Sequence, residues 1–348
     1  MAFTAQELNN IANAVLDFHI RGKVESQVIQ DRPLYNDLHK NTKKFGGGKE
    51  YVTGRAKGTY TSSMQGYSHD DEQAYGNPAN IKEWQAKWYE VGSGIAVTHT
   101  ELKKAGVHVV DTESVVNGSS QSQASDQELY ALTSLLEDKY EDLDEGSKRS
   151  FAEMLWRDGT QDAKAVPGIL SFILDAPTTG VTFGIDRAAN SWWRNRASVS
   201  IDSSTASNQN LVNTLQKEFR QLRRYAAPKH KFYAGSDFMD AFEKELRSKG
   251  NYTLEGWANQ KMIDASVADI AFKGIMIQYE PLLDDLGRSK YGYVLDTNAI
   301  KLMPMENEDW KLHQPARPAE KYVLYRALTW TGALVANRLN TSGVYAIL

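Results

Sequence analysis

Side chains that perform acid–base, nucleophilic or metal chemistry are scattered along this sequence. Its seven histidines never recur at the spacing of a zinc motif. The absence of cysteine excludes disulfides, thiolate metal ligands and cysteine nucleophiles. The Gly-x-Ser-x-Gly turn that carries the nucleophile of many hydrolases does not occur either. We therefore expect no catalytic residue, no metal site and no cofactor.

Acidic clusters are the remaining candidates for chemistry. Glycosidases need two carboxylates at a defined separation, and one of them must be shielded from water. The clusters here stand in polar sequence, so turn formation and solvation explain them better than catalysis does. The same holds for His69, which precedes the first cluster and would otherwise suggest a cation site. The three clusters are residues 70–72, 284–285 and 306–309.

Length and composition indicate a soluble globular chain. It has 348 residues, of which 41% are hydrophobic and 24% charged, enough for one or two hydrophobic cores. The formal net charge of -4 gives no electrostatic footprint for tight duplex binding, which needs clustered Lys and Arg. No apolar run approaches the length of a membrane span and no signal-peptide pattern opens the sequence, so we expect a cytoplasmic product without membrane contact.

The longest element that the sequence predicts is an amphipathic helix over residues 125–156. Leucines and aromatic residues recur there at steps of three and four. Ser125 and Glu128 fit a capping box at its start. Gly146 weakens such a helix by roughly 1 kcal/mol relative to Ala, so a break after Glu145 is the alternative. Unbroken, the helix would span roughly 45 to 50 Å, since each residue adds about 1.5 Å.

Residues 50–102 predict strand-like ribbons joined by a long polar tip. Trp84, Ala86 and Trp88 alternate on one face, and the same alternation recurs from 95 to 99. The tip, residues 58–80, has no core pattern, and so long a loop without structure of its own usually has a function. It is either a protruding arm that packs on a neighbouring molecule or a floppy surface loop. The candidate contact residues are Tyr60, Tyr67, Tyr75, Trp84 and Trp88.

Shorter elements are predicted for the rest of the chain. A helix is expected at 8–18, followed by a polar tract at 21–44 that is either frayed or ordered on another surface. An apolar final strand at 343–348 indicates that this end is tied into a sheet. Further helices are expected at 208–226 and 237–247, strands at 230–233, 272–279, 291–295 and 300–303, and a segment of mixed helix and strand at 322–335.

Taken in order, these elements resemble the major capsid proteins of tailed bacteriophages that have the HK97-type fold. The resemblance extends over nearly the whole chain and rests on fold markers, not on active-site motifs. In many members a Phe-Tyr-x-Gly strand precedes a helix, and a Lys-Gly-Ile strand followed by Pro leads back out. The most specific stretches are residues 231–238 and 272–283, and the closing segment 322–347 with Arg326, Gly332 and Arg338.

The resemblance implies an α+β fold with an N-terminal arm, an extended β-hairpin loop, a long spine helix, a peripheral domain sheet and an axial domain. A sheet of the peripheral domain is expected to be shared between the two ends of the chain. The implied boundaries are 1–48 for the arm, 49–103 for the extended loop, 104–164 with 301–348 for the peripheral domain, about 120–158 for the spine helix within it, and 165–300 for the axial domain.

The same resemblance implies a structural role without enzyme activity. Copies of one chain would form hexamers and pentamers of an icosahedral head around double-stranded DNA, with the DNA held only by weak non-specific contact. Further implied partners are a separate scaffolding protein, a portal and a decoration protein. The chain would be made and assembled in the cytoplasm of a bacterial host and reside in the virion capsid.

Two alternatives remain open at this point. A portal or tail component would form rings or tubes in place of closed shells, although portal chains are usually longer and more helical. A carbohydrate-active enzyme would use the eight Trp residues and the carboxylate clusters, and it would be a monomer with a Trp-lined cleft. The size of the assembled species separates all three hypotheses.

Overall fold

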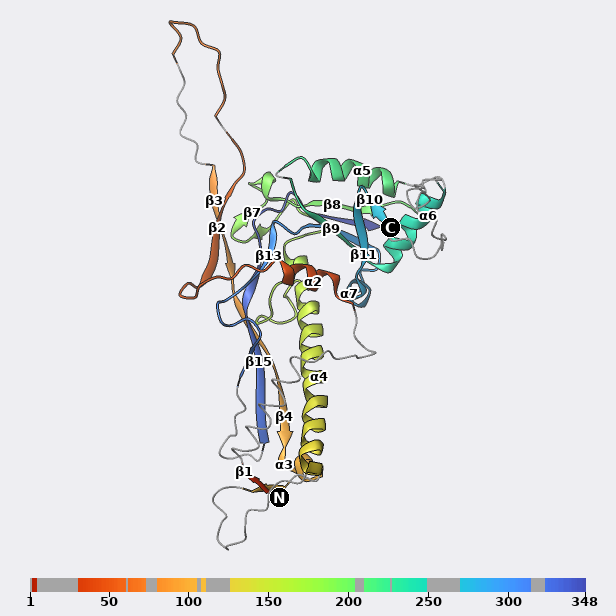
Figure 1. The fold of residues 1–348 in the computed structure, drawn as a ribbon. Helices are drawn as coiled ribbons and strands as arrows, with labels where there is room; N and C mark the ends of the chain where they lie inside the picture. Colours follow the sequence, from red (N-terminus) through yellow and green to blue (C-terminus); the bar gives the residue numbers. More distant parts are fainter. Residues whose placement is uncertain are drawn as a thin grey trace, which may run out of the picture. The chain divides into compact units, whose positions relative to one another are not determined.

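A computed structural model describes residues 2–4, 31–60, 62–72, 80–104, 108–110, 126–203, 210–225, 227–248, 270–313 and 323–348. The chain divides into two compact units. Unit 1 comprises residues 1–30, 90–151 and 307–331, and unit 2 comprises residues 31–89, 152–306 and 332–348. Figure 1 gives the order and labels of the elements. The helix expected at 8–18 lies outside the described residues.

A six-stranded mixed sheet organises unit 2. Its strand order is β10-β11-β9-β12-β16-β8, parallel between β11 and β9 and between β16 and β8, and antiparallel elsewhere. The closing strand β16 therefore has a partner on each side, which confirms that this end of the chain is tied into a sheet. The strands are β8 (Arg196–Ile201), β9 (His230–Ala234), β10 (Ala271–Phe272), β11 (Ile275–Tyr279), β12 (Tyr291–Asp296) and β16 (Gly343–Ile347).

Strand β16 lies inside this sheet. It pairs with β12 and β8, which both lie within residues 165–300. Residues 343–346 are buried, as expected for a strand with a neighbour on each side. The boundary of 301–348 for the peripheral domain stays a prediction.

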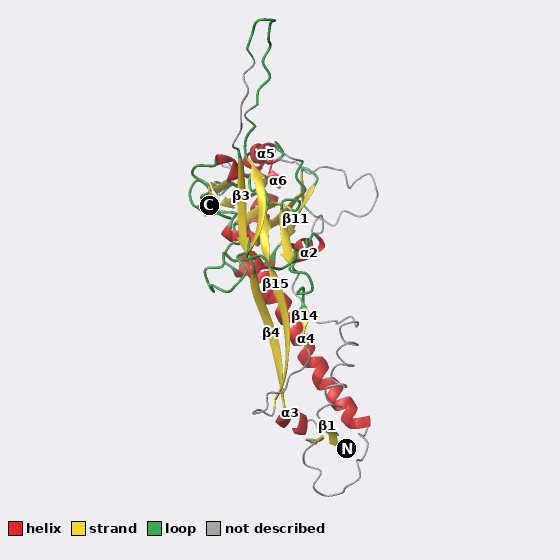
Figure 2. Ribbon diagram, turned by 90° about the vertical axis from the view of Figure 1, so that its left-hand side faces the viewer, coloured by secondary structure: helices red, strands yellow, loops and turns green. Residues whose placement is uncertain are grey.

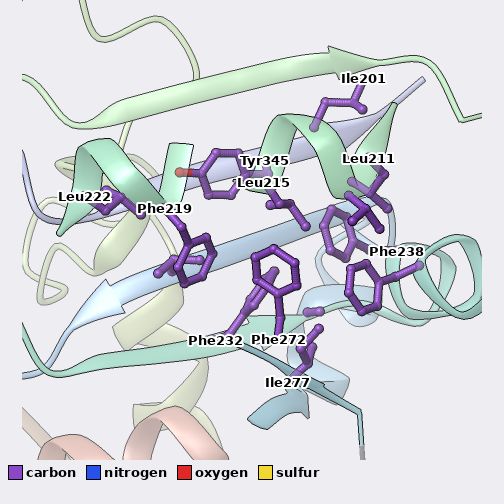
Figure 3. Close-up of a cluster of buried hydrophobic side chains, with 14 residues drawn as sticks. Ile201, Leu211, Leu215, Phe219, Leu222, Phe232, Phe238, Phe272, Ile277 and Tyr345 are labelled. Carbon is purple, nitrogen blue, oxygen red and sulfur yellow. The ribbon is translucent and has the colours of Figure 1, made fainter. Parts of the chain in front are cut away.

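Two amphipathic helices cover the aromatic side of this sheet. They are α5 (Leu211–Leu222) and α6 (Ser236–Ser248), close to the ranges that the sequence predicted. Phe219 of α5 meets Phe232 of β9 and Phe272 of β10 with ring centroids 6.2 and 5.0 Å apart. Figure 3 shows these rings gathered in one cluster between the helices and the strands. Burial of such rings is the main stabilising contribution here.

A buried carboxylate joins the two helices. Glu245 of α6 accepts hydrogen bonds from the backbone N–H groups of Leu211 (2.9 Å) and Val212 (3.1 Å). These are orphan donors of the first turn of α5, and Asn210 before them makes no side-chain cap. Glu245 therefore supplies from a distant element the cap that the local sequence lacks.

The opposite face of the sheet packs on the end of a long helix. The predicted helix is confirmed as α4 (Asp126–Trp156), 31 residues without a break at Gly146. Apart from the neighbouring helix backbone, no atom of the described residues lies within 4 Å of a Cβ built at Gly146, so this glycine is not needed for a close approach. Trp156 in its last turn meets Tyr233 and Tyr293 with centroids 6.1 and 5.2 Å apart. Because neighbouring residues of a strand point to opposite faces, Phe232 and Tyr233 serve the two different sides.

Unit 1 is built on long strands and most of α4. Strand β4 (Tyr89–Thr98) pairs with β15 (Val323–Ala336), and β15 pairs with β14 (Lys311–Leu312). Phe151 of α4 packs on Trp330 and Trp310, with ring centroids 4.6 and 5.2 Å apart. The last part of β15, from Gly332, pairs instead with β13 (Ile300–Pro304) in unit 2. A parallel pair, β1 (Ala2–Thr4) with β5 (His108–Val110), completes the described strands of unit 1.

Two expectations for these segments were wrong. Residues 323–336 are strand throughout, because they pair on successive stretches with β14 and β13, so no part is helical. His99 does not extend the alternation of β4, because it begins α3 (His99–Lys104). Thr98 and Glu101 form a capping box there: Glu101 accepts from the Thr98 N–H at 3.0 Å and donates its own N–H to the Thr98 hydroxyl at 3.2 Å.

The polar tract at 21–44 contains a helix that the sequence analysis missed. Helix α2 (Pro33–Lys40) buries Leu34, Tyr35 and Leu38 within unit 2. Pro at its first position and leucines four residues apart were the available signals. The chain then runs beside β13, where the Lys43 N–H donates to Leu302 O at 3.0 Å. This part of the tract is therefore ordered on its own chain.

Short elements complete unit 2. They are β2 (Tyr51–Lys57), β3 (Ile81–Lys87), the 3-10 turns η1 (Ile169–Ser171) and η2 (Ser191–Trp193), β6 (Val181–Thr182), β7 (Ile185–Asp186) and α7 (Pro281–Asp285). Among the described residues, no helix combines the length and apolar character needed to cross a membrane.

Helix α2 begins on a buried acid. Leu34 donates its N–H to Oε2 of Glu280 at 3.0 Å, and Glu280 is fully buried. Burial raises the pKa of Glu280 from 4.5 to about 7, the Leu34 N–H lowers it in part, and Asp31 raises it further. Because the folded pKa lies above the unfolded one, the folded state holds this proton more tightly, and stability falls as pH rises from about 4.5 through 7.

Replacing Glu280 by Gln tests this assignment. Gln keeps an oxygen for the Leu34 N–H but has no charge to bury, so the variant should gain unfolding free energy over the parent as pH rises, by ~1–3 kcal/mol between pH 5 and pH 8. Urea unfolding followed by circular dichroism at both pH values measures the difference. Glu306→Gln, at an exposed position, is the control and should show no such growth. A Glu280→Gln advantage that is equal at both pH values would contradict the assignment.

Candidate assembly surface

The hairpin of β2 and β3 carries the residues that the sequence singled out. Its strands pair antiparallel from Tyr51 opposite Lys87 to Lys57 opposite Ile81. Burial alternates along them, as predicted from the period of two. The face that packs on unit 2 is formed by Val52, Ala56, Trp84 and Ala86.

Two indole rings lie directly on the glycine backbone of β2 and of the residue after it. We call this region, around Gly54 and Gly58, the root of the hairpin. Trp84 stands opposite Gly54 in the register, and a Cβ built at Gly54 would lie 2.4 Å from Cζ2 of the indole. At Gly58 a Cβ would lie 2.1 Å from Cε2 of Trp192. Real Cβ contacts are never this short, so only glycine leaves room for either ring. The root is therefore defined by close aromatic packing on backbone.

The side chains of Trp84 and Trp88 make contacts within their own chain. Trp84 is 4% exposed and meets Phe183 edge-on, with ring centroids 6.4 Å apart. Trp88 is half-buried and donates its indole N–H to Lys49 O at 2.9 Å. Gln85 between them donates its N–H to Phe183 O at 3.0 Å. These contacts leave Trp84 almost no surface for a neighbouring molecule.

A buried arginine builds the loop on which the root rests. Arg187 donates from Nε to the Thr182 hydroxyl and from Nη1 to Asn195 Oδ1, both at 2.8 Å, and from Nη2 to Phe172 O. Burial lowers its pKa to about 10, so it stays charged near neutrality. This network orders the segment that presents Trp192, whose role the sequence analysis missed because only its glycine-rich, aromatic setting was visible.

The tip of the hairpin exposes the remaining candidates. Tyr60 is 82% exposed and Tyr67 is 70% exposed, whereas Tyr75 lies outside the described residues. Ser68 donates its N–H to Oδ2 of Asp71 at 2.7 Å, which closes a turn. Figures 1 and 2 show the described residues 62–72 of the tip standing clear of the rest of unit 2. Tyr60 and Tyr67 thus present aromatic surface that their own unit does not cover.

The residues examined for chemistry serve local structure. The described residues contain no group of three or more metal-binding side chains. Asp284 accepts from the Ser236 N–H at 3.0 Å and from the Tyr279 hydroxyl at 2.7 Å. His230 bonds Thr341 O at 2.9 Å, and burial lowers its pKa. The contacts of Asp284 match the turn role that the sequence favoured for this cluster.

Comparison with known proteins gives no match in sequence and a clear match in structure. No family model matches the chain, and no curated protein matches it. The chain resembles the capsid asymmetric unit of cyanophage A-1(L) with a TM-score of 0.63 and 12% identity, over 93% of this chain and 94% of that one. The capsid of Myoviridae phage XM1 gives a TM-score of 0.55 and 11% identity, over 94% and 95%. Mycobacterium phage Bobi gives 0.54 and 12%, over 97% and 99%.

These matches define the class of fold. The chain has an α+β fold of the HK97 type, shared along nearly its full length with subunits of phage capsids. At 9–12% identity in the matches with a TM-score above 0.5, the similarity is one of fold. It confirms the fold class that the order of elements implied.

Replacing Gly54 by Val tests the packing at the root. Val favours strands, so any loss comes from the clash with Trp84, and we expect the free energy of unfolding to fall by about 1–3 kcal/mol. Urea unfolding measures it. Gly66→Val in the tip is the matched control, because a Cβ there meets nothing within 4 Å. Equal effects of the two substitutions would show that Trp84 does not lie on Gly54.

Proposed function

We propose that this chain is a major capsid protein whose copies assemble into a closed icosahedral shell around double-stranded DNA. The observation that carries the proposal is the fold, which matches the capsids of cyanophage A-1(L) and Myoviridae phage XM1 over 93% and 94% of the chain. The exposed hairpin tip adds to it, since Tyr60 and Tyr67 offer exposed aromatic surface. Hexamers and pentamers of one chain would form the shell.

Each part of the chain has a place in this proposal. The N-terminal arm (1–48) and the extended loop (49–103) reach neighbouring copies, and residues 165–300 form the axial domain at the centre of each hexamer or pentamer. The peripheral domain comprises 104–164 and 301–348. Its final strand, β16, pairs with β12 and β8 of the six-stranded sheet. Within the loop, Tyr60, Tyr67 and Tyr75 are the proposed contacts. Trp88, a further candidate, follows the pair Tyr51 and Lys87 at the other end of the β2–β3 ladder.

Many modest contacts would hold such a shell. Burial of apolar surface contributes ~25 cal/mol per Å², so two exposed tyrosines supply a few kcal/mol per copy at most. In a closed assembly every copy gives and receives these contacts, and their number provides the stability.

The further partners of the proposal follow from a shell. We expect a separate scaffolding protein, a portal and a decoration protein, assembly in the bacterial cytoplasm and a final location in the virion. Contact with packaged DNA would be weak and non-specific. The role is structural and not enzymatic, and no observation on this chain favours a portal, a tail component or a carbohydrate-active enzyme.

Replacing residues 61–79 by a short Gly-Ser linker tests the proposal. The root contacts stay intact, so the subunit should remain folded with an unchanged unfolding midpoint, while the yield of particles falls at least about tenfold because apolar contact area is lost. Negative-stain microscopy and sedimentation of the expressed chain, with and without a co-expressed scaffold candidate, provide the measurement.

Paired substitutions separate the aromatic contacts from the length of the tip. Tyr60→Ser with Tyr67→Ser should reduce particle yield, whereas Tyr60→Phe with Tyr67→Phe keeps the rings and should preserve it. Full particle yield from the shortened hairpin would remove the tip from assembly. A parent chain that remains a monomer under all conditions would overturn the shell proposal itself.

A further inference from the structure

A strongly basic concavity lies beside the root of the hairpin. It has a volume of about 1630 Å³ and is walled by β2, the 191–197 segment, the end of α5, and β13 with the 335–340 segment, all within unit 2. Eight Lys and Arg residues line it, and no Asp or Glu is among the described residues that do. In a chain of net charge -4, this concentrates one-fifth of the 40 basic residues at one place.

Two of these cations are paired inside the chain. Arg196 makes a bidentate contact with Glu218 at 2.7 and 2.8 Å. Arg338 lies 3.8 Å from Oδ2 of Asp296. For the other six, no carboxylate in the described part of the chain lies within salt-bridge distance. They are Lys43, Arg55, Lys57, Arg194, Arg224 and Lys301.

The unpaired cations converge from separate elements. Arg55 and Lys57 alternate with the buried side of β2, Lys301 comes from β13, and Arg224 follows α5. Arg194 is held in place by donating to Arg187 O at 2.7 Å and Ala188 O at 2.9 Å. Like charges gathered in a concavity repel each other and focus a positive field, which an anionic ligand relieves.

The same hairpin carries the opposite charge at its far end. Asp70, Asp71 and Glu72 follow one another and are exposed. Two hydrogen bonds between Ser68 and Asp71 close a turn that includes Asp70. Figures 1 and 2 show this tip pointing away from the root of its own hairpin, so it does not reach the concavity of its own chain.

We propose that the concavity binds the acidic hairpin tip, residues 68–72, of a second copy of this chain. This inference rests on the proposed shell function and names the surface that receives the tip. Each copy would offer one tip and one concavity, which is a head-to-tail contact that closes into rings when the rotation between copies allows it. A peptide turn fits a concavity of this size.

Aromatic side chains make the concavity suitable for the tip as a whole. Tyr60, Trp192 and Tyr225 share its lining with the cations. Lys57 lies over the Tyr60 ring at 4.2 Å and Arg224 over Tyr225 at 5.5 Å, so both ammonium and guanidinium groups are pre-oriented. Pre-oriented donors bind carboxylates without first losing side-chain freedom.

A charge exchange tests the proposal. Asp70→Lys, Asp71→Lys and Glu72→Lys together should reduce particle yield at least about tenfold, and so should Lys43→Glu, Arg55→Glu and Lys301→Glu together. The six substitutions combined should restore most of the yield, because the two surfaces are again complementary. The control is Lys217→Glu, Lys244→Glu and Lys290→Glu, which changes the net charge equally outside the concavity and should leave the yield unchanged.

A binding assay makes the result independent of particle formation. A fluorescent synthetic peptide of residues 62–72 should bind the full unassembled chain, lose at least tenfold in affinity when its three acids become Asn or Gln, and weaken between 50 and 500 mM NaCl. Lys43→Glu, Arg55→Glu and Lys301→Glu together should abolish binding. Circular dichroism of each variant confirms that it is folded.

The outcomes separate this inference from the shell proposal. If the parent forms no particles, the shell proposal fails, and peptide binding still decides the fit of tip and concavity. If the parent forms particles but the combined variant shows no rescue and the peptide does not bind, the inference is overturned. Binding of a labelled DNA duplex to the concavity, lost in the Lys43, Arg55 and Lys301 variant while the peptide fails to bind, would also overturn it.

Discussion

Burial of both faces of the six-stranded sheet is the interaction on which unit 2 depends. Phe219 and its neighbouring rings cover one side and Trp156 covers the other, so adjacent residues of β9 serve opposite cores. The sheet thereby fixes α5, α6 and the end of α4 against one set of strands. Helix α2 joins the same body through Glu280, a buried carboxylate that accepts the N–H of Leu34. The hairpin root then rests on loops that this body orders.

The periodicity of apolar residues made much of this fold predictable, and the wrong or missed predictions have identifiable causes. Helix α4 was predictable because its apolar residues recur over many turns, and the final strand because its residues are apolar. Helix α2 was missed because it is short and lies in polar sequence, so its stability comes from tertiary packing. Helix α3 was missed although Thr98 and Glu101 spell a capping box, because the strand alternation before it masked the change of period. The tertiary pairing of β15 overrode its mixed local preference.

The candidate surfaces were only partly visible in the sequence. Exposed tyrosines in a long polar loop are a local signal, and Tyr60 and Tyr67 are indeed uncovered. Trp84 gave the same signal but is enclosed, because its register partner is a glycine. The basic concavity draws its cations from segments more than 250 residues apart, from Lys43 to Arg338, so no window of sequence contains it. The net charge of the chain gives no sign of the basic concavity either, because Asp and Glu outnumber Lys and Arg over the whole sequence.

The root of the hairpin has a mechanical consequence. The indole rings of Trp84 and Trp192 lie in direct contact with the backbone of Gly54 and Gly58. This close packing fixes the direction of the hairpin at these two glycines. The ladder of β2 with β3 ends at the pair Lys57 and Ile81, so strand pairing sets the direction of the hairpin up to that pair. In the proposed shell, copies that occupy sites of unequal curvature would therefore share the same origin of the hairpin.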